Sequence, residues 1–204
     1  MGFVKEFAIF LQESGAIKFG NFKLSSGKES AYYVDLRLVP SFPHQFRKMI
    51  KSLQNLISEK IGLDSFDYIA SVPTSGLVIA SALAIETLKP LIYIRQKPKD
   101  YGTSSLIEGK IPEGSRVILV DDVGTTGHSL LNAIKVLRDA KIIVDSAFVI
   151  VNRLEGAKEN LETERVKMYE ITNILEISNV LHNEKILDDQ TLDRIKKQMS
   201  STKV

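Results

Sequence analysis

The chain has 204 residues and a net charge of +2, and this balance gives no electrostatic case for nucleic acid as the main partner. It contains no cysteine, which excludes a disulfide framework, a thiol nucleophile and a thiolate metal site and fits a reducing compartment. The length allows one sizeable core, and no apolar run reaches the roughly 18 residues of a membrane span, so we expect a cytoplasmic protein without a membrane partner.

The N-terminal segment predicts a small appendage to the core. Residues 3–14 place Phe3, Phe7, Phe10 and Leu11 on one face of a helix, and the charged residues among them argue against a signal peptide. Residues 16–37, AIKFGNFKLSSGKESAYYVDLR, form short alternating segments that are broken by Gly20 and by residues 25–27. This pattern is typical of a small antiparallel patch outside a parallel core.

From residue 67 onward the sequence alternates between strands and helices, after a helix that runs to about residue 61. We expect strands at residues 68–72, 91–95, 117–120, 147–151 and 166–169, with helices near 76–88 and 129–139. Apolar strands separated by helices predict an α/β fold, a Rossmann-like parallel β-sheet flanked by helices on both faces. Ligands of such sheets collect at the carboxyl ends of the strands, so functional residues are expected directly after each strand.

The first core strand is followed by VPTSG, residues 72–76, a loop of small residues that enters a helix. By itself this loop is more typical of a tight turn capped by Thr74 or Ser75. Next to a second anion-binding loop on another strand, however, Thr74, Ser75 and Gly76 predict a nest for a diphosphate group.

A long loop rich in cations follows the second strand. Residues 94–114 contain Arg95, Lys97, Lys99 and Lys110 together with three Gly and two Pro, and they show little periodicity. One interpretation is a solvated charged loop. The other is a mobile cover that brings positive charge to a departing diphosphate and excludes water while it departs.

The third strand lies in VILVDDVGTTGHS, residues 117–129, a pattern of strand, acidic end, turn and helix. A helix that begins in a turn of small residues leaves its first N–H groups unpaired in front of a positive dipole end, which predicts a phosphate site. Asp121 and Asp122 suit a pair of vicinal hydroxyls or a hydrated Mg²⁺. An acidic pair alone is often only a cap, but a cap does not need two Asp, two Thr and two Gly together. Phosphate and diol together describe a ribose 5-phosphate.

Arg153 follows the fourth strand, in the sequence VNRLEG. An arginine at such a position is either a solubilising charge or a ligand for a carboxylate or a pyrimidine carbonyl edge, which the guanidinium fork matches. Its place at a strand end makes it a candidate for recognising a base.

Residues 117–129 resemble the phosphoribosyl-diphosphate (PRPP) binding motif of the type I phosphoribosyltransferases. Residues 15–37 resemble the N-terminal hood of the orotate phosphoribosyltransferases, and RQKPKDYGTSSLIEG, residues 95–109, resembles their catalytic lid. The resemblance implies the type I phosphoribosyltransferase fold, with an N-terminal helix and hood in residues 1–40 and the core in residues 41–204, as a single structural unit. It also implies a homodimer that shares the lid across subunits.

The same resemblance implies reversible transfer of phosphoribosyl from PRPP to orotate, which gives orotidine 5′-monophosphate and diphosphate in the synthesis of UMP. Mg²⁺ is the expected cofactor, bound through PRPP without a direct protein ligand. The expected catalytic residues are Lys99, which would reach the neighbouring subunit's site, Arg95, Asp121 and Asp122. The expected substrate-binding residues are Gly124, Thr125, Thr126, Gly127, His128 and Ser129 in the PRPP motif, Thr74, Ser75 and Gly76 at the diphosphate, Lys28, Lys97 and Tyr101 in the hood and lid, and Tyr32, Tyr33 and Arg153, with Val34, at the base.

The chain departs from the usual bacterial pattern of this family in three places. Ser25 stands where the hood usually carries a lysine, Gln96 stands where the lid usually has a second basic residue, and Tyr101 replaces a lid histidine. Two cationic contacts and one proton donor are therefore missing, and Lys97 or Lys28 are the candidates to compensate.

Two other functions stay open at this point. Several nucleobase families share the motif of residues 117–129, so a transferase that acts on uracil or a purine is one alternative. A regulator that keeps the PRPP fold as a nucleotide sensor is the other. The intact acidic pair, the cationic loop and the absence of a basic patch argue against the regulator.

Overall fold

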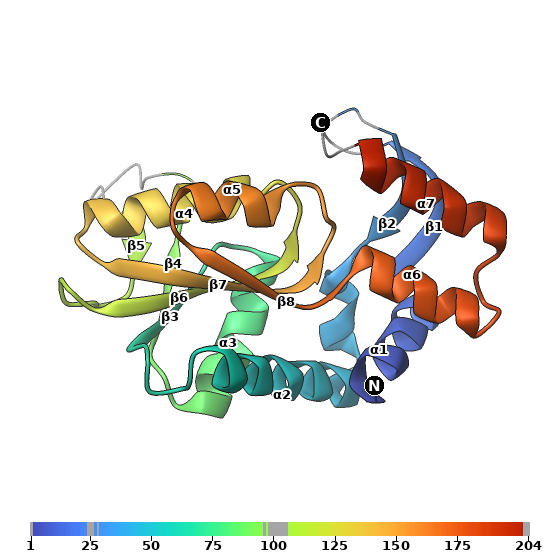
Figure 1. The fold of residues 1–204 in the computed structure, drawn as a ribbon. Coiled ribbons are helices and arrows are strands. Elements are labelled where there is room, and N and C mark those ends of the chain that lie inside the picture. Colours follow the sequence, from blue (N-terminus) through green and yellow to red (C-terminus); the bar gives the residue numbers. More distant parts are fainter. Residues whose placement is uncertain (1, 24–26, 28, 96, 98–105, 202–204) are drawn as a thin grey trace.

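A six-stranded sheet runs through the centre of the protein in a computed structural model that describes residues 2–23, 27, 29–95, 97 and 106–201 (Figure 1). The strand order is β5-β4-β3-β6-β7-β8. The strands are β3 (Tyr68–Ser71), β4 (Leu91–Ile94), β5 (Ile107–Glu108), β6 (Arg116–Gly124), β7 (Ile143–Asn152) and β8 (Lys167–Asn173). All neighbours pair in parallel except β5, which is antiparallel to β4. The predicted strands are confirmed, whereas the two-residue β5 was not predicted.

Strand β6 is longer than predicted: we expected the third strand to end at residue 120, and it ends at Gly124. The strand continues through Asp121 and Asp122, because β7 still pairs with it as far as Gly124, which lies opposite Asn152. On its other side β3 pairs only as far as Val120. The acidic pair therefore lies inside a strand but has a hydrogen-bonded neighbour on one side only, which leaves its other side open at the end of the sheet.

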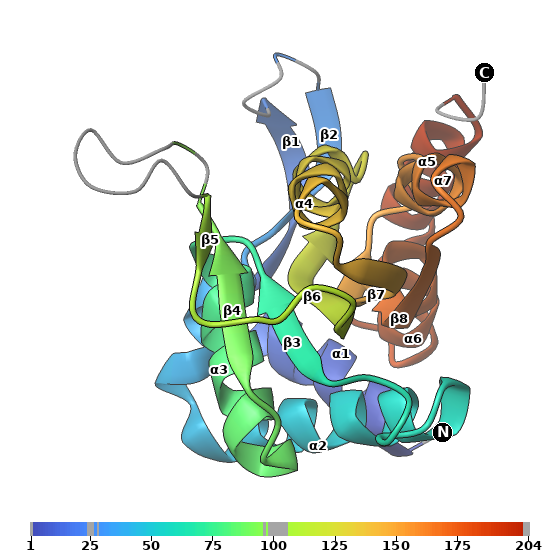
Figure 2. The same ribbon diagram turned by 90° about the vertical axis from the view of Figure 1, so that its left-hand side faces the viewer.

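Helices cover both faces of the sheet, as Figure 1 and Figure 2 show. Helices α2 (Pro43–Lys60) and α3 (Ser75–Thr87) cover one face, and α4 (His128–Asp139) and α5 (Ala157–Thr163) cover the other. Ile118 and Val120 of β6 belong to the apolar core on the α2 and α3 side, while Val117 and Leu119 belong to the core on the α4 side. Burial on both faces is the reason that these strands read as unbroken apolar runs.

The N-terminal hood consists of α1 (Gly2–Glu13), β1 (Ile17–Lys23) and β2 (Glu29–Val34), and the 3-10 helix η1 (Leu36–Ser41) connects it to α2. Strands β1 and β2 pair antiparallel, which confirms the predicted patch. The register shifts between Phe19 and Phe22, where Gly20 has φ of 155°. A side chain rarely adopts that φ, so the glycine permits the irregularity.

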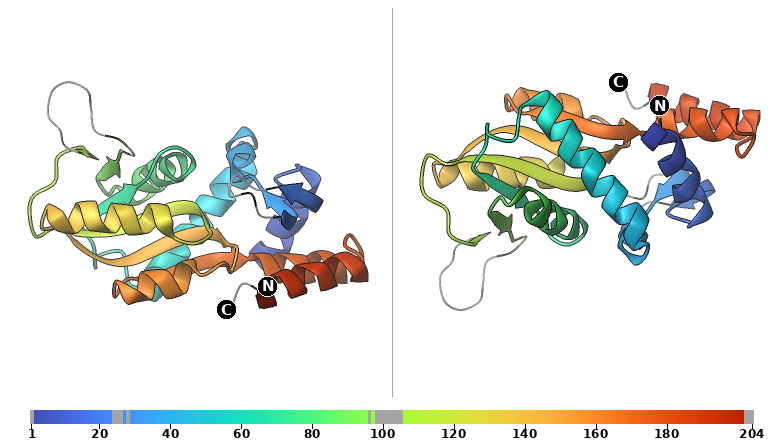
Figure 3. Two further views of the ribbon diagram at one scale, coloured as in Figure 1. Left: turned by 90° about the horizontal axis from the view of Figure 1, so that it is seen from above. Right: turned by 90° about the horizontal axis from the view of Figure 1, so that it is seen from below.

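The C-terminal helices α6 (Ile174–Asn183) and α7 (Asp189–Ser201) leave β8 and pack against the hood, at one end of the sheet (Figure 3). The Gln198 side chain accepts a hydrogen bond from the backbone N–H of Ala31 at 2.8 Å. Arg194 Nη2 donates to the carbonyl oxygen of Gly20 at 3.4 Å. Residues from both ends of the chain thus build this layer together, and the predicted boundary near residue 40 stays a prediction.

Candidate active site

Two helices begin side by side at the carboxyl ends of neighbouring strands. Helix α3 follows β3, α4 follows β6, and the two strands pair in parallel with Ser71 opposite Val120. The residues that precede the helices, Thr74 and Gly127, provide no side-chain hydrogen bond to the first turn. The first N–H groups of both helices are therefore available at one edge of the sheet, together with the positive ends of two helix dipoles. This arrangement favours an extended anion.

Residues 124–129, which we call the phosphate loop, have four of their backbone carbonyl oxygens in hydrogen bonds. The bonds are Arg153 N–H to Gly124 O (2.8 Å), Ala157 N–H to Thr125 O (3.0 Å), Asn160 Nδ2 to Thr126 O (2.9 Å) and Leu131 N–H to Gly127 O (2.8 Å). Among the described backbone hydrogen bonds, none is donated by an amide of residues 125–129. A small pocket of about 50 Å³ is lined by this loop and Asp121. Unpaired amides around a pocket at a helix start are the kind of site that can hold a phosphate group.

Helix α5 forms the back wall of the phosphate loop, and it was not predicted. Gly127 has φ of 77°, and a Cβ atom there would lie 2.6 Å from Leu161 Cδ1 and 3.3 Å from the carbonyl oxygen of Ala157. Both the backbone conformation and the close approach therefore require glycine. In front of the loop the His128 ring is exposed, with Nε2 at 3.1 Å from Asn132 Nδ2.

Asp121 lies between the starts of the two helices. A Cβ atom on Gly76, in the first turn of α3, would lie only 2.4 Å from Asp121 Oδ1. The same carboxylate oxygen accepts a hydrogen bond from the Asp122 N–H at 2.9 Å. Burial, and after it the charge of Asp122, raises the pKa of Asp121 well above its ordinary value. Hydrogen bonds from new donors, such as the hydroxyls of a ribose, would stabilise the ionised form of such a carboxylate.

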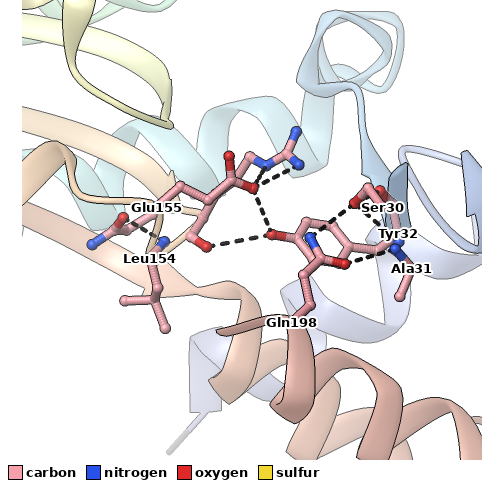
Figure 4. Close-up of polar contacts among 8 residues, drawn as sticks. Ser30, Ala31, Tyr32, Leu154, Glu155 and Gln198 are labelled. Carbon is pink, nitrogen blue, oxygen red and sulfur yellow. Dashed lines mark hydrogen bonds and ion pairs between the residues drawn. The ribbon is translucent and has the colours of Figure 1, made fainter. Parts of the chain in front are cut away.

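Arg153 connects the phosphate loop to the hood. It directly follows β7, and its side chain is buried, with a residue exposure of 7%. Its Nε donates to Glu155 Oε1 at 2.9 Å, and its guanidinium lies over the ring of Tyr32, 4.9 Å from the centroid. The Tyr32 hydroxyl lies 3.1 Å from Glu155 Oε1 and 3.3 Å from the carbonyl oxygen of Arg153 (Figure 4). Burial raises the pKa of Tyr32, so the hydroxyl stays protonated and donates.

Glu155 was missed by the sequence reasoning. The sequence shows only that Glu155 lies two residues after Arg153. Two opposite charges this close in a turn can form an ion pair or can both be solvated, and only coordinates distinguish the two cases. Tyr33 alternates away from Tyr32 along β2, lies beside the Phe22 ring at 5.9 Å, and accepts a hydrogen bond from Arg37 Nη2 at 3.3 Å. Of the two tyrosines, Tyr32 is the one with described contacts to Arg153.

Arg95 lies at the base of the predicted lid. Its Nε donates to the carbonyl oxygen of Lys97 at 3.2 Å, and its Nη1 lies 3.3 Å from Glu108 Oε1. A cavity of about 560 Å³ is lined by residues that include Arg95, His128 and Ser129, so this arginine shares a cavity with the start of α4. The predicted site residues Lys28, Lys99 and Tyr101 lie outside the described residues, as do Ser25 and Gln96.

Replacing Gly76 by alanine should disrupt the contact between α3 and Asp121. The new Cβ atom would lie 2.4 Å from Asp121 Oδ1 and 3.1 Å from Asp121 Cα. We expect Gly76→Ala to lower kcat/KM for PRPP by about a hundredfold, the cost of misplacing a reactant by about 1 Å, as measured by diphosphate release. Gly2→Ala is the control, because a Cβ atom there meets nothing within 4 Å. Unchanged turnover of Gly76→Ala would contradict this geometry.

Asp121→Asn should make the ligand-free protein more stable at neutral pH. Because the pKa of Asp121 is raised by folding, its contribution to stability is complete below the ordinary pKa of about 3.9 and is lost as the pH rises through the raised value. Asparagine does not ionise and avoids this loss. We expect a Tm about 3 °C or more above the wild type at pH 8, the shift that roughly 1 kcal/mol gives a chain of this size.

The Tm difference between Asp121→Asn and the wild type should close toward pH 4, and thermal melting at a series of pH values measures it. Asp64→Asn, which removes an exposed carboxylate in the turn before β3, is the matched control and should follow the wild type. A Tm difference that is the same at every pH would show that ionisation of Asp121 is not its cause.

Comparisons with known proteins agree with this geometry. Residues 44–186 match the family model described as phosphoribosyl transferase domain. The orotate phosphoribosyltransferase of Cenarchaeum symbiosum is 50% identical over 182 residues, which cover 89% of this chain and 91% of that protein. The one from Methanocaldococcus jannaschii is 43% identical over 169 residues, covering 83% of this chain and 93% of that protein.

A solved structure supports the same assignment. The crystal structure of orotate phosphoribosyltransferase from Aeropyrum pernix is 34% identical and matches with a TM-score of 0.78, covering 89% of this chain and 99% of that chain. The predicted type I phosphoribosyltransferase fold is thereby confirmed. The chain belongs to the phosphoribosyltransferase family.

Proposed function

We propose that the protein is an orotate phosphoribosyltransferase, which transfers phosphoribosyl from PRPP to N1 of orotate and releases diphosphate and orotidine 5′-monophosphate in the synthesis of UMP. The observation that carries the proposal is the buried Arg153 guanidinium beside the phosphate loop, joined to it by the bond from Arg153 N–H to Gly124 O at 2.8 Å. A buried cation next to a sugar-phosphate site suits an anionic base. The names of the relatives point to the same base.

The donors at the sheet edge divide naturally among the parts of PRPP. The free amides of residues 125–129 suit the 5-phosphate, and Asp121 with Asp122 suits the ribose hydroxyls. The uncapped start of α3, at Thr74, Ser75 and Gly76, suits the diphosphate. Arg95 and, from the lid of the neighbouring subunit, Lys99 would neutralise the charge that grows on the leaving diphosphate.

The chemistry asks for no nucleophile from the protein. Attack occurs at the anomeric carbon, where the ring oxygen shares positive charge, so the transition state is oxocarbenium-like, as in glycoside chemistry. Orotate is already an anion at neutral pH and attacks through N1. The protein contributes by holding the two reactants in line and by offering fixed charges to the leaving group.

The donor set fits a Mg²⁺ ion that is carried by the substrate. Within residues 2–23, 27, 29–95, 97 and 106–201, no group of three or more His, Asp or Glu side chains could hold a metal ion. Mg²⁺ usually keeps several waters and needs only one or two carboxylates in addition to substrate phosphates. Asp121 and Asp122 are the residues that would face it, and when bound it neutralises diphosphate charge.

A panel of bases tests the proposed substrate. We expect diphosphate release from PRPP with orotate and not with uracil or adenine. We expect Arg153→Lys to lower kcat/KM for orotate by about a hundredfold, because a planar guanidinium held by Glu155 and Tyr32 becomes a point charge on a flexible stem. Arg138→Lys is the control, because Arg138 forms an exposed ion pair with Glu164 at 3.1 Å. Release with uracil or a purine alone would identify another transferase, and no release with any base would favour the nucleotide sensor.

We further propose a cytoplasmic homodimer. Helix α3 is apolar nearly all round, and its outer side leaves Val78 and Ile85 exposed by 43% and 77%. Leu88, which directly follows the helix, is 89% exposed. Val78 and Ile85 are seven residues apart and lie on one side of the helix, so with Leu88 they form an apolar surface that suits a second copy of the chain. Among the described helices, none has both the length and the apolar character required to cross a membrane. The lack of cysteine fits a reducing compartment.

Subunit complementation tests lid sharing. Lys99→Ala and Asp121→Asn should each be nearly inactive alone. In a mixed dimer the Lys99→Ala subunit keeps Asp121 and receives Lys99 from its partner, so one of the two sites is complete. After reversible dissociation and mixing, about half of the dimers contain one subunit of each variant, and each mixed dimer has one complete site of its two. About a quarter of all sites are then complete, so the mixture should restore about a quarter of wild-type diphosphate release. No recovery on mixing would mean that each subunit uses its own lid.

A further inference from the structure

The guanidinium of Arg153 is held from two directions. Its Nε donates to Glu155 Oε1 at 2.9 Å, and its Nη2 lies 2.8 Å from the same oxygen. Its face lies over the Tyr32 ring, with the central carbon 4.9 Å from the ring centroid. These contacts use one edge and one face of the group. Nη1, on the other edge, has no described hydrogen-bond partner.

Nη1 is also the nitrogen that a ligand can reach. Within the described residues, Nη2 of Arg153 is the one fully buried side-chain nitrogen or oxygen without an aligned hydrogen bond, and Nη1 is not in this class. Nη1 therefore keeps contact with the surface, although the residue as a whole is 7% exposed. A guanidinium whose Nε edge is occupied presents Nη1 to a ligand in one orientation.

Glu155 cannot easily release this hold. Its Oε1 receives the Tyr32 hydroxyl at 3.1 Å in addition to the two guanidinium nitrogens, and its side chain is only 17% exposed. If Glu155 turned outward, the Arg153 charge would stay buried without a counter-charge, which is unfavourable. The Tyr32 hydroxyl would keep only the carbonyl oxygen of Arg153, at 3.3 Å.

Tyr32 in turn is fixed by the C-terminal helix, as Figure 4 shows. Gln198 Oε1 accepts from the Ala31 N–H at 2.8 Å, and Gln198 Nε2 donates to Ser30 Oγ at 3.2 Å. Ser30 Oγ donates to the carbonyl oxygen of Tyr32 at 2.7 Å. A continuous set of hydrogen bonds therefore runs from α7 through β2 to Glu155 and Arg153.

We propose that Glu155 is a positioning residue for base recognition: it holds Arg153 by the Nε edge, with Tyr32 as support, so that Nη1 is directed at the acidic substituent of the base. This inference rests on the proposed function, because it assigns Arg153 to an anionic base. It adds that the preference for such a base depends on a carboxylate that does not itself need to touch the base.

Steady-state kinetics of Glu155→Gln tests the positioning role. The amide keeps the shape of the side chain and its acceptor oxygen but loses the negative charge, so it holds the guanidinium edge more weakly. We expect KM for orotate to rise by about tenfold or more, the scale of one charge-assisted hydrogen bond, with KM for PRPP within about twofold of the wild type. Tyr32→Phe keeps the ring under Arg153, removes the hydroxyl, and should shift KM for orotate in the same direction by less.

Glu164→Gln is the matched control, because it removes the carboxylate of an exposed Arg–Glu pair with Arg138. A spectroscopic reading complements the kinetics. The Nε–Hε resonance of Arg153, identified by its loss in Arg153→Lys, should be sharp in the wild type and shifted or broadened in Glu155→Gln and Tyr32→Phe, and unchanged in Glu164→Gln.

The outcomes separate the two proposals. If the wild type uses orotate but Glu155→Gln leaves KM for orotate and the Arg153 resonance unchanged, the positioning role is wrong and the proposed function stands. An equal rise in KM for both substrates would also overturn it, because a merely structural role would act on both. If the wild type does not use orotate, the proposed function fails, and the resonance alone decides whether Glu155 orients Arg153.

Discussion

The hydrogen bonds behind the phosphate loop determine what the loop presents in front. The backbone carbonyls of residues 124–127 accept from the end of β7, from α5 and from the first turn of α4. Each peptide unit points its N–H away from its C=O, so holding the carbonyls from behind directs the amides toward the pocket. An anion then finds donors already in place, and no rearrangement of the backbone is required when it binds.

The same edge of the sheet holds two ionisable groups, Asp121 and Arg153, that are largely buried. Asp121 is pressed against Gly76 and beside Asp122, and its pKa is raised. Arg153 is buried and depends on one carboxylate oxygen for its counter-charge. Because its pKa is raised, ionised Asp121 costs the ligand-free protein stability at neutral pH. The apolar cores on both faces of the sheet supply the stability that this arrangement requires.

The base-recognition region is assembled from three distant parts of the chain. Tyr32 comes from the hood, Arg153 and Glu155 come from the turn after β7, and Gln198 comes from the last helix. Because the hood strands form their own small sheet, their position over the core depends on α1, α6 and α7 packing beside them. The hydrogen bonds of Ser30 and Tyr32 connect this layer to Arg153.

The sequence by itself determined the strands, the main crossover helices, the fold class and the phosphate loop, because periodicity and a short motif are local properties. It also made Asp121 and Arg153 candidates, from their expected places at the ends of buried strands, although Asp121 lies inside β6. Only the tertiary structure decided that β6 runs on to Gly124, that α5 supports the loop, that Gly76 makes room for Asp121, and that Glu155 holds Arg153. Each of these depends on two segments that meet only after folding, and a single sequence records neither their distance nor their orientation.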